Sequence, residues 1–335
     1  MQLIKGFEGL APGQRGASVA LGNFDGVHRG HQALIAEAAR AGARIGAPTG
    51  VITFEPHPRR FFQPDAPPFR LTPSREKARI LAKHGVGHIH ELAFDATLAA
   101  MPAEAFVEQI LAGGDRGGLG IRHLVIGEDF RFGKGRTGDA RLLRNMSADL
   151  GFTVSIHHIL KGEAGEYSST AVRVHLEEGR CDAAAAQLGR WHGVSGPVIK
   201  GDQRGREFGY PTANLTFGEQ IIPRYGIYAA QVEVLDGPHA GTHAGVASIG
   251  ERPTFGINAP NFEVHLFDFD GDLYGAQISA GLVAYLRGEE RFDNIEALIV
   301  QMGQDASLAR ARLPMHLSPA GSPVDWGGSG IARAA

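Results

Sequence analysis

The feature that most constrains the fold is an alternation of short apolar runs with longer helix-like segments, from residue 17 to about residue 160. The short runs are typical of buried strands, and apolar residues spaced three and four apart in the longer segments are typical of amphipathic helices. Strands that alternate with helices predict βαβ units and a parallel sheet, with ligands at the carboxyl ends of the strands. The predicted strands are 18–22, 50–54, 123–127 and 152–159, and the predicted helical segments are 31–44, 74–85 and 103–113.

A different pattern begins near residue 193, where short β-rich pieces are separated by Gly, Pro and Asn. This pattern predicts an antiparallel sheet or a small barrel. The segment 176–189 is expected to be a helix that bridges the two regions, and 295–313 is expected to be a closing helix. The residues from 314 on are rich in Gly, Ser, Pro and Ala, which predicts a flexible tail. The β-rich pieces are 193–199, 226–235, 243–250, 261–269 and 277–286.

The composition is that of an ordinary globular protein, and a length of 335 residues favours two domains. Hydrophobic residues make up 43% and charged residues 21%, whereas the 47 glycines are roughly twice the average share. The net charge of −3 predicts no general attraction to nucleic acid or to anionic membranes. The single cysteine, Cys181, excludes an internal disulfide and fits a reducing compartment. Because the chain shows neither a signal-like apolar core nor a stretch of ~20 apolar residues, we expect a cytoplasmic protein.

The decapeptide GNFDGVHRGH, residues 22–31, directly follows the first predicted strand. If a helix begins near Val27, His28 and His31 share one helix face, and Gly30 leaves room for a phosphate to approach the backbone. The N-terminus of a helix adds unpaired N–H donors and the positive end of a dipole. Imidazoles at that position can donate to a phosphoryl group whose negative charge grows in the transition state.

Two other interpretations of these histidines stay open at this point. A zinc site would need at least one further ligand, for which the single cysteine offers no pattern. Histidines can also act only in helix capping or core packing. Asn23, Asp25 and the three glycines of the decapeptide fit polar recognition better than packing.

Two companion stretches follow later strands of the same region. In TFEPHPRRFF, residues 53–62, His57 stands between two prolines that fix the local backbone. The stretch GEDFRFGKGRTGD, residues 127–139, resembles a Walker loop, but Gly135 follows Lys134 where Ser or Thr is required, so a P-loop is rejected. The charged side chains that this stretch places at the sheet edge are Asp129, Arg131 and Lys134.

A third companion stretch, YSSTAVR at residues 167–173, carries hydroxyl groups where a helix is expected to begin. Its hydroxyls can cap the helix, and Arg173 lies one turn in, which is a second anion-binding arrangement. Capping alone would account for Ser168, Ser169 and Thr170 taken singly. Four polar clusters at strand ends favour a binding site.

The β-rich region contains a glycine-rich turn followed by Pro-Thr-Ala-Asn, within residues 196–215. In an extended segment Thr212 and Asn214 lie on one face, where their oxygens could bind a magnesium ion already neutralised by ATP phosphates. An ordinary turn, in which the Asn side chain bonds its own backbone, is the alternative interpretation.

Downstream, the stretch NFEVHLFDFDGDLYG at 261–275 places Glu263 and His265 on one face of a strand. A single carboxylate there can accept a proton from a substrate hydroxyl, although a cross-strand charge is the plainer interpretation. The motifs that flank this stretch contribute two further candidate site residues, Arg252 and Arg287.

Taken together, these motifs resemble those of the bacterial bifunctional riboflavin kinase/FMN adenylyltransferases, the FAD synthetases. GNFDGVHRGH, TFEPHP, GEDFRFGKGRTGD and SSTAVR occur in the family's order, and GREFGYPTAN, GERPTFG, EVHLFDFDGDLYG and LRGEERFDNIEAL follow in the order of its kinase module. The resemblance implies a Rossmann-like nucleotidyltransferase domain with a parallel sheet at 1–185. It also implies a riboflavin kinase domain at 186–313, a six-stranded antiparallel Greek-key barrel with a closing helix, before the tail at 314–335.

The resemblance also implies roles for individual residues. His28 and His31 would stabilise the α-phosphate of ATP during attack by the FMN phosphate, and Glu263 would activate the riboflavin 5′-hydroxyl. Thr212 and Asn214 would bind the metal of Mg-ATP. The family's SST motif often continues with Arg, where this chain has Ala171. The implied nucleotide- and flavin-binding residues are Gly22, Asn23, Phe24, Asp25, His57, Asp129, Arg131, Ser168, Ser169, Thr170 and Arg173 in the first domain, and Gly201, Arg206, Gly209, Pro211, Thr212, Asn214, Arg252 and Arg287 in the second.

The expected function is therefore phosphorylation of riboflavin to FMN, followed by adenylylation of FMN to FAD, both with Mg-ATP. The expected partners are these small molecules, without nucleic acid or membrane, and with a homo-oligomer as an open possibility. Two rival hypotheses are an enzyme with only one working activity, and a flavin- or nucleotide-binding regulator without turnover. Loss of His31, Asn214 or Glu263 would be the mark of the regulator, and all three are present.

Overall fold

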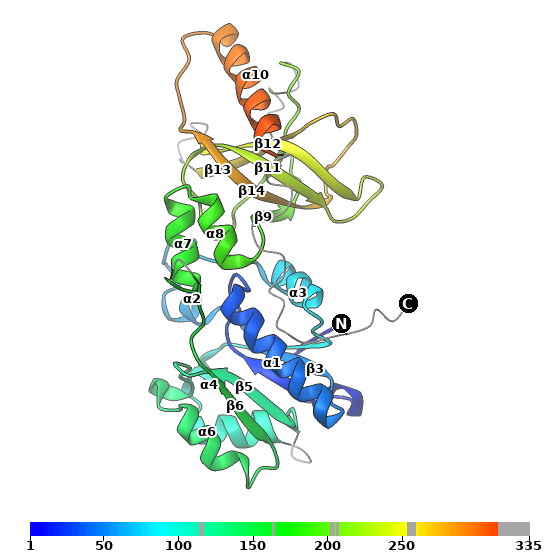
Figure 1. The fold of residues 1–335 in the computed structure, drawn as a ribbon, viewed down its shortest axis with the longest axis vertical. Coiled ribbons are helices and arrows are strands. Elements are labelled where there is room, and N and C mark those ends of the chain that lie inside the picture. The colour runs from blue at the N-terminus through cyan, green and yellow to red at the C-terminus, as the bar shows by residue number, and fades with distance from the viewer. Residues whose placement is uncertain (114–116, 163–164, 202–204, 206–207, 253–258, 314–335) are drawn as a thin grey trace. The chain divides into compact units, whose positions relative to one another are not determined.

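A computed structural model describes residues 1–113, 117–162, 165–201, 205, 208–252 and 259–313. The chain divides into two compact units (Figure 1). The N-terminal unit comprises Met1–Pro67 and Thr72–Ser169, and the C-terminal unit comprises Pro68–Leu71 and the chain from Thr170 on. The predicted domain boundary at 185/186 falls within a helix of the C-terminal unit. The tail expected at 314–335 lies outside the described residues.

The N-terminal unit is built on a six-stranded, fully parallel sheet with the order β1-β4-β3-β2-β5-β6. This confirms the predicted α/β fold. The strand order changes direction at β2, which pairs with β3 on one side and β5 on the other, and such a switch point is where open parallel sheets bind ligands. The strands are β1 Gln2–Lys5, β2 Ser18–Leu21, β3 Thr49–Glu55, β4 His88–Ala93, β5 His123–Gly127 and β6 Thr153–His157; a small hairpin adds β7 Lys161–Gly162 and β8 Gly165–Glu166.

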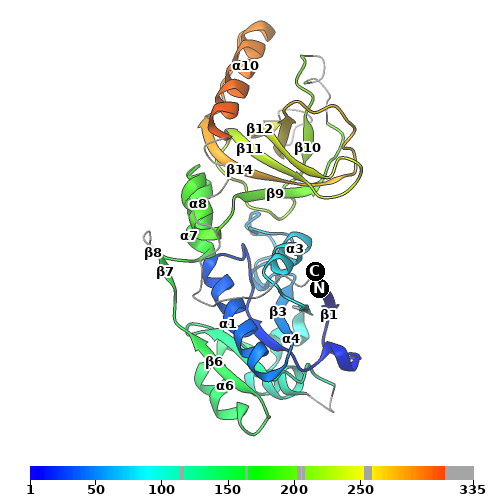
Figure 2. The ribbon, with the colours of Figure 1, turned by 45° about the vertical axis from the view of Figure 1, so that its right-hand side comes forward.

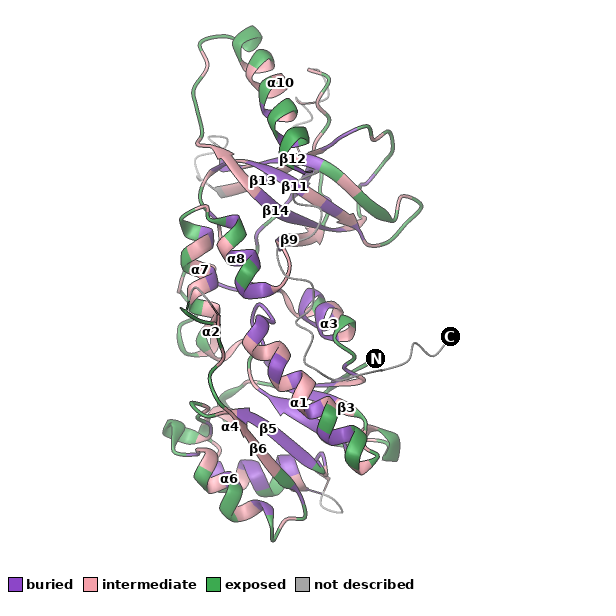
Figure 3. Cartoon of the chain, viewed as in Figure 1, coloured by how far each residue is buried: buried purple, intermediate pink, exposed green. Residues whose placement is uncertain are grey.

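Both faces of the four inner strands of this sheet, β2 to β5, are buried, whereas the outer strands β1 and β6 are more exposed. Successive side chains of a strand point to opposite sides of the sheet. Val19 of β2 lies in the hydrophobic core beneath η2 and α6, whereas its neighbour Ala20 lies in the core beneath α1 and α3. The buried strands stand out in Figure 3. The helices are α1 Arg29–Ile45, α2 Pro58–Phe62, α3 Ser74–Lys83, α4 Ala96–Ala100, α5 Ala103–Ala105, η1 Pro12–Gln14, the π-helical η2 Phe106–Ala112, η4 Lys134–Arg136 and α6 Ala140–Ser147.

The C-terminal unit is a six-stranded antiparallel sheet with the order β10-β13-β12-β11-β14-β9. The sheet curls on itself, and Ile199, just past β9, donates its N–H to the carbonyl of Asn214 in β10 at 2.9 Å. This bridge joins the two outer strands and confirms the predicted barrel (Figure 2). The strands are β9 His192–Pro197, β10 Ala213–Leu215, β11 Gly226–Val234, β12 Gly241–Arg252, β13 Ala259–Leu266 and β14 Gln277–Arg287.

Three longer helices belong to the C-terminal unit, apart from the first residue of one of them, Ser169. The predicted closing helix is α10, Ile295–Arg312, whose Asn294 side chain accepts a hydrogen bond from the Ala297 N–H. The single helix expected at 176–189 is instead two helices, α7 Ser169–Glu177 and α8 Cys181–Leu188. The chain breaks between them at Gly179, whose φ of +75° lies in the left-handed region that terminates helices.

Candidate active sites

In the N-terminal unit, the histidine pair lies at the start of α1, beyond the carboxyl end of β2. The helix begins at Arg29, two residues later than expected, because Gly26 and Val27 both take positive φ angles, +83° and +44°. His28 is therefore the N-cap and His31 lies in the first turn. The two rings nevertheless stack, with centroids 3.7 Å apart and an interplanar angle of 25°. The structure thus brings the predicted pair together at a helix N-terminus.

The environment of His31 disfavours its charged form. Burial, then the neighbouring His28, then Lys77 hold the pKa of His31 well below its usual range. Its Nδ1 atom is buried and makes no hydrogen bond within the described part of the chain. At neutral pH His31 is therefore an uncharged imidazole, which offers one N–H donor to a ligand.

The loop between β2 and α1 is anchored by neighbouring segments. The Asp25 carboxylate accepts a hydrogen bond from the Thr72 N–H at 3.2 Å, and the Thr72 hydroxyl accepts one from the Gly26 N–H at 3.1 Å. The Ser169 hydroxyl donates to the Asp25 carbonyl at 2.8 Å. Of the predicted binding residues, Asp25 and Ser169 thus hold the loop itself.

The other predicted residues of this loop differ in exposure. Phe24 is fully buried, and its ring centroid lies 5.0 Å from that of His31. Asn23 is exposed, whereas Gly22 is half-buried and donates its N–H to the Ile52 carbonyl of β3.

Two further predicted segments follow neighbouring strands. His57, just after β3, caps α2, and its Nδ1 accepts a hydrogen bond from the Arg59 N–H at 3.1 Å, which leaves the proton of a neutral ring on Nε2. Asp129 and Arg131 follow β5 and are exposed. Because β3 and β5 both pair with β2, these segments emerge at the same edge of the sheet as the histidine pair.

The SST motif crosses the division between the units. Ser168 is half-buried and Ser169 begins α7, and both belong to the N-terminal unit. Thr170, which is exposed, and Arg173 belong to the C-terminal unit. The Arg173 guanidinium donates to the Phe69 carbonyl at 2.8 Å and lies over the Phe69 ring, so in this structure it holds the Pro68–Leu71 segment.

In the C-terminal unit, the predicted magnesium ligands lie beside the predicted base. Asn214 of β10 pairs in register with Glu263 of β13, and the Thr212 hydroxyl donates to the Glu263 carboxylate at 3.3 Å. The second Glu263 oxygen accepts a hydrogen bond from the Asn261 side chain at 2.7 Å. Since Val264 and Leu266 point into the barrel core, Glu263 and His265 face outward, as the alternation predicts.

A cavity of about 280 Å³ opens on this outer face of the barrel. Thr212 and Glu263 line it from one side, and Leu298, Met302 and Asp305 line it from α10. A mixed wall of apolar side chains and a few polar groups is typical of small-molecule sites. The cavity thus joins the predicted base to side chains that sequence reasoning did not single out.

Two contacts from His265 fix the segment just before Thr212. His265 Nδ1 donates to the Pro211 carbonyl at 2.8 Å, and the Tyr210 ring packs edge-on against the His265 ring. Pro211 itself is exposed, as is Gly209. His265 therefore anchors the Tyr210–Thr212 segment at the rim of the cavity.

Arg287, predicted to bind a ligand, lines the cavity but is engaged with α10. Its guanidinium donates to both carboxylate oxygens of Asp305, at 2.9 and 2.7 Å. These hydrogen bonds raise the pKa of Arg287 above its ordinary value. Of the other predicted arginines, Arg206 lies outside the described residues, and only the backbone of Arg252, at the end of β12, is described.

Gly201 lies against the Asn214 side chain. A Cβ atom at this position would come within 2.5 to 2.6 Å of the side-chain amide atoms of Asn214. Only glycine therefore fits here without displacing Asn214.

Sequence reasoning missed three residues around the histidine loop, namely Thr53, Thr72 and Lys77. The Lys77 side chain is 2% exposed although α3 reads as an ordinary amphipathic helix. Thr53 is part of the TFEPHP motif, so the sequence did point to its segment. Thr72 and Lys77 carried no comparable sequence signal, since only the packing of α3 and of the segment just before it places them at the loop.

Comparison with known proteins identifies two modules in this order. A family model described as FAD synthetase matches residues 11–171, and one described as riboflavin kinase matches residues 188–313. The chain is 39% identical over 312 residues to a bifunctional riboflavin kinase/FMN adenylyltransferase from Pseudomonas fluorescens, and 40% identical over 311 residues to one from Escherichia coli strain K12. These alignments cover 93% and 92% of this chain and 97% of each relative.

Among solved structures, one from Streptococcus pneumoniae matches with a TM-score of 0.79 and 29% identity, over 92% of this chain and 98% of the other. That structure is described as a macrolide-efflux protein. Within the residues described for the present chain, no helix has the length and apolar character needed to cross a membrane. Since the named relatives match almost end to end and both family models occur in order, the chain belongs to the bifunctional riboflavin kinase/FMN adenylyltransferase family.

Proposed function

We propose that the C-terminal unit phosphorylates riboflavin to FMN with ATP, and that the N-terminal unit transfers AMP from ATP to FMN, giving FAD and pyrophosphate. One observation carries this proposal. Each family match contains its own cluster of polar side chains, the stacked His28 and His31 in one and Thr212, Asn214 and Glu263 in the other.

In the kinase reaction, Glu263 acts as the general base. Its carboxylate lines the cavity and accepts the proton of the riboflavin 5′-hydroxyl, whose oxygen attacks the γ-phosphorus of ATP as ADP leaves. The hydrogen bonds from Thr212 and Asn261 orient the carboxylate before substrate binds. Arg287 and its partner Asp305 form the wall of the cavity next to α10.

The donor set beside Glu263 fits magnesium. The Thr212 hydroxyl and the Asn214 amide supply neutral oxygens next to a carboxylate, and Mg²⁺ prefers oxygen ligands and shares its coordination with ATP phosphates. Thr212 and Asn214 would hold the ion, which would neutralise phosphate charge during phosphoryl transfer.

In the adenylyl transfer, the FMN phosphate oxygen attacks the α-phosphorus of ATP, and pyrophosphate leaves. Charge grows on the α-phosphate oxygens in the transition state, where N–H donors of fixed position are worth most. His28 and His31 supply such donors at a helix N-terminus, whose own N–H groups and dipole favour anions. His57, Asp129, Arg131 and Ser168 lie on segments that complete the nucleotide and flavin contacts at this edge.

Separate substrates test the two halves of the proposal. Purified protein with Mg-ATP is expected to convert riboflavin to FMN, and, in a second reaction, to convert added FMN to FAD, as measured by chromatography. Omission of Mg²⁺ should abolish both conversions. Conversion of riboflavin alone would refute the adenylyltransferase half, conversion of FMN alone would refute the kinase half, and neither product would refute the whole proposal.

Gly201→Ala is expected to lower kcat/KM of the kinase reaction by roughly tenfold or more, because the new methyl group would displace the Asn214 amide. The matched control is Gly196→Ala in β9, where a Cβ atom would meet nothing within 4 Å. Both variants should retain adenylyltransferase activity. Equal kinase rates for the two variants would show that the position of Asn214 does not matter for phosphoryl transfer.

A further inference from the structure

We propose that Thr53 and Lys77 are positioning residues for adenylyl transfer, because they fix the backbone of the loop that carries His28 and His31. This inference rests on the proposed adenylyltransferase function of the N-terminal unit. Neither side chain needs to touch a substrate. Their effect passes through the Asn23 carbonyl, which lies two residues beyond the end of β2.

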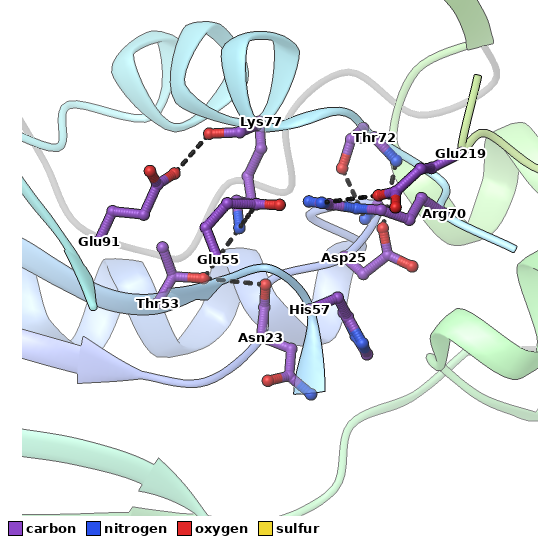
Figure 4. A network of polar contacts seen from close by, with 12 residues as sticks. Asn23, Asp25, Thr53, Glu55, His57, Arg70, Thr72, Lys77, Glu91 and Glu219 are labelled. Atoms are coloured by element: carbon purple, nitrogen blue, oxygen red, sulfur yellow. Dashed lines mark hydrogen bonds and ion pairs between the residues drawn. The ribbon is translucent and has the colours of Figure 1, made fainter. Parts of the chain in front are cut away.

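The contacts form a continuous chain from α3 to the loop (Figure 4). The Lys77 ammonium donates to the Thr53 hydroxyl at 3.0 Å, and that hydroxyl donates to the Asn23 carbonyl at 3.1 Å. Thr53 is fully buried near the end of β3, and the Lys77 side chain is 2% exposed. A threonine hydroxyl has a single proton to donate. Because the Thr53 oxygen accepts a hydrogen bond from Lys77, its own proton points to the Asn23 carbonyl. The lysine therefore sets the direction of the threonine hydrogen bond.

The loop needs such fixed points because its backbone is strained. Phe24 and Val27 have φ angles of +51° and +44°, and neither is a glycine. A bulky or β-branched residue adopts this conformation only where the surroundings impose it. Asn23 is held by Thr53 on one side of Phe24, and Asp25 and Gly26 are held by Thr72 on the other. Release of one anchor allows the strained loop to relax and moves the two imidazoles.

The charge of Lys77 is balanced, which favours a positioning role over direct phosphate binding. The ammonium lies 3.8 Å from the Glu55 carboxylate, on the same face of β3 as Thr53. Burial of an ammonium without such a partner would be strongly unfavourable. Since the Lys77 ammonium is already paired with Glu55 and hydrogen-bonded to Thr53 inside the protein, it is suited to orienting Thr53 and less suited to binding a phosphate from solvent.

The test compares Thr53→Val with Thr53→Ser. Valine keeps the shape of threonine and removes the hydroxyl, whereas serine keeps the hydroxyl. We expect Thr53→Val to lower kcat for FAD formation from FMN by roughly tenfold, because misplaced donors stabilise the transition state less well. The KM for ATP should change less than about twofold, and Thr53→Ser should stay within about threefold of the unmodified protein.

A Lys77→Met variant, alone and combined with Thr53→Val, tests whether Lys77 and Thr53 act through the same hydrogen bonds. Lys77→Met should lower the same kcat, and Thr53→Val added to it should cost little more, since both changes break one chain of hydrogen bonds. FMN formation from riboflavin, measured on each protein, should stay unchanged. If Thr53→Val matches Thr53→Ser in kcat, or if Thr53→Val lowers kinase activity equally, the positioning role is wrong even when the protein folds.

These outcomes remain distinct from failure of the proposed function. An unmodified protein that makes no FAD from FMN refutes the adenylyltransferase assignment itself. An unmodified protein that makes FAD, together with a fully active Thr53→Val variant, refutes only the positioning role. A lower melting temperature of Thr53→Val with unchanged kcat would assign Thr53 to stability alone and would also overturn the inference.

Discussion

Replacement of His31 by alanine is expected to lower FAD formation from FMN and ATP by about 10²- to 10³-fold, the usual effect of removing one donor to transition-state charge. His31 stacks on His28 at the N-terminus of α1 and stays uncharged at neutral pH. Its removal also deprives His28 of the ring that fixes its orientation. FMN formation from riboflavin should be unchanged, because the kinase cluster belongs to the other unit.

The measurement is the initial rate of FAD formation from FMN, with kinase activity assayed on the same preparation. His88→Ala is a matched control, since it removes a half-buried imidazole from β4 of the same unit. That control should keep both activities. An active His31→Ala protein would show that the stacked geometry of the pair does not serve adenylyl transfer. Loss of both activities in a folded protein would contradict two separate sites.

Glu263→Gln is expected to produce the opposite pattern, with kinase activity lowered by about 10²- to 10⁴-fold, the range typical for loss of a general base. Glutamine keeps the size of the side chain and can still contact Thr212 and Asn261, but it cannot accept the substrate proton. FAD formation from added FMN should persist.

Product chromatography with riboflavin and with FMN as separate substrates checks this result. Glu233→Gln, a half-buried carboxylate on β11 of the same barrel, is the control and should retain both activities. A Glu263→Gln protein with full kinase activity would exclude Glu263 as the base. It would leave the cavity without its assigned proton acceptor.

Much of the fold could be predicted from local pattern. The apolar runs at β2, β3 and β5 are visible in the sequence, because strands buried on both faces are continuously apolar. Strand β6 was also predicted, although it is only partly buried. Strand β4 was missed for a physical reason: its sequence HIHELA carries polar residues that are buried here, among them His90 and Glu91. Burial lowers the pKa of His90 to about 4, so this ring is accommodated uncharged.

The candidate sites were predictable where the motif itself holds the chemistry. The histidine pair and the Thr212, Asn214 and Glu263 cluster come together as the strand ends and the strand alternation require. The supporting residues were not predictable, because their roles depend on packing between segments. Lys77 lies on a helix whose sequence pattern would also suit an exposed lysine, and the α10 residues of the cavity are placed by packing against the barrel.

The central claim is that the two units act on different phosphates of ATP, and labelled ATP tests it most directly. Purified protein receives riboflavin, Mg²⁺ and ATP labelled at either the α- or the γ-phosphate, and the flavin products are separated and counted. We expect γ-label in FMN and in FAD, and α-label in FAD alone. Appearance of α-label in FMN, or formation of FAD without γ-label, would contradict the account.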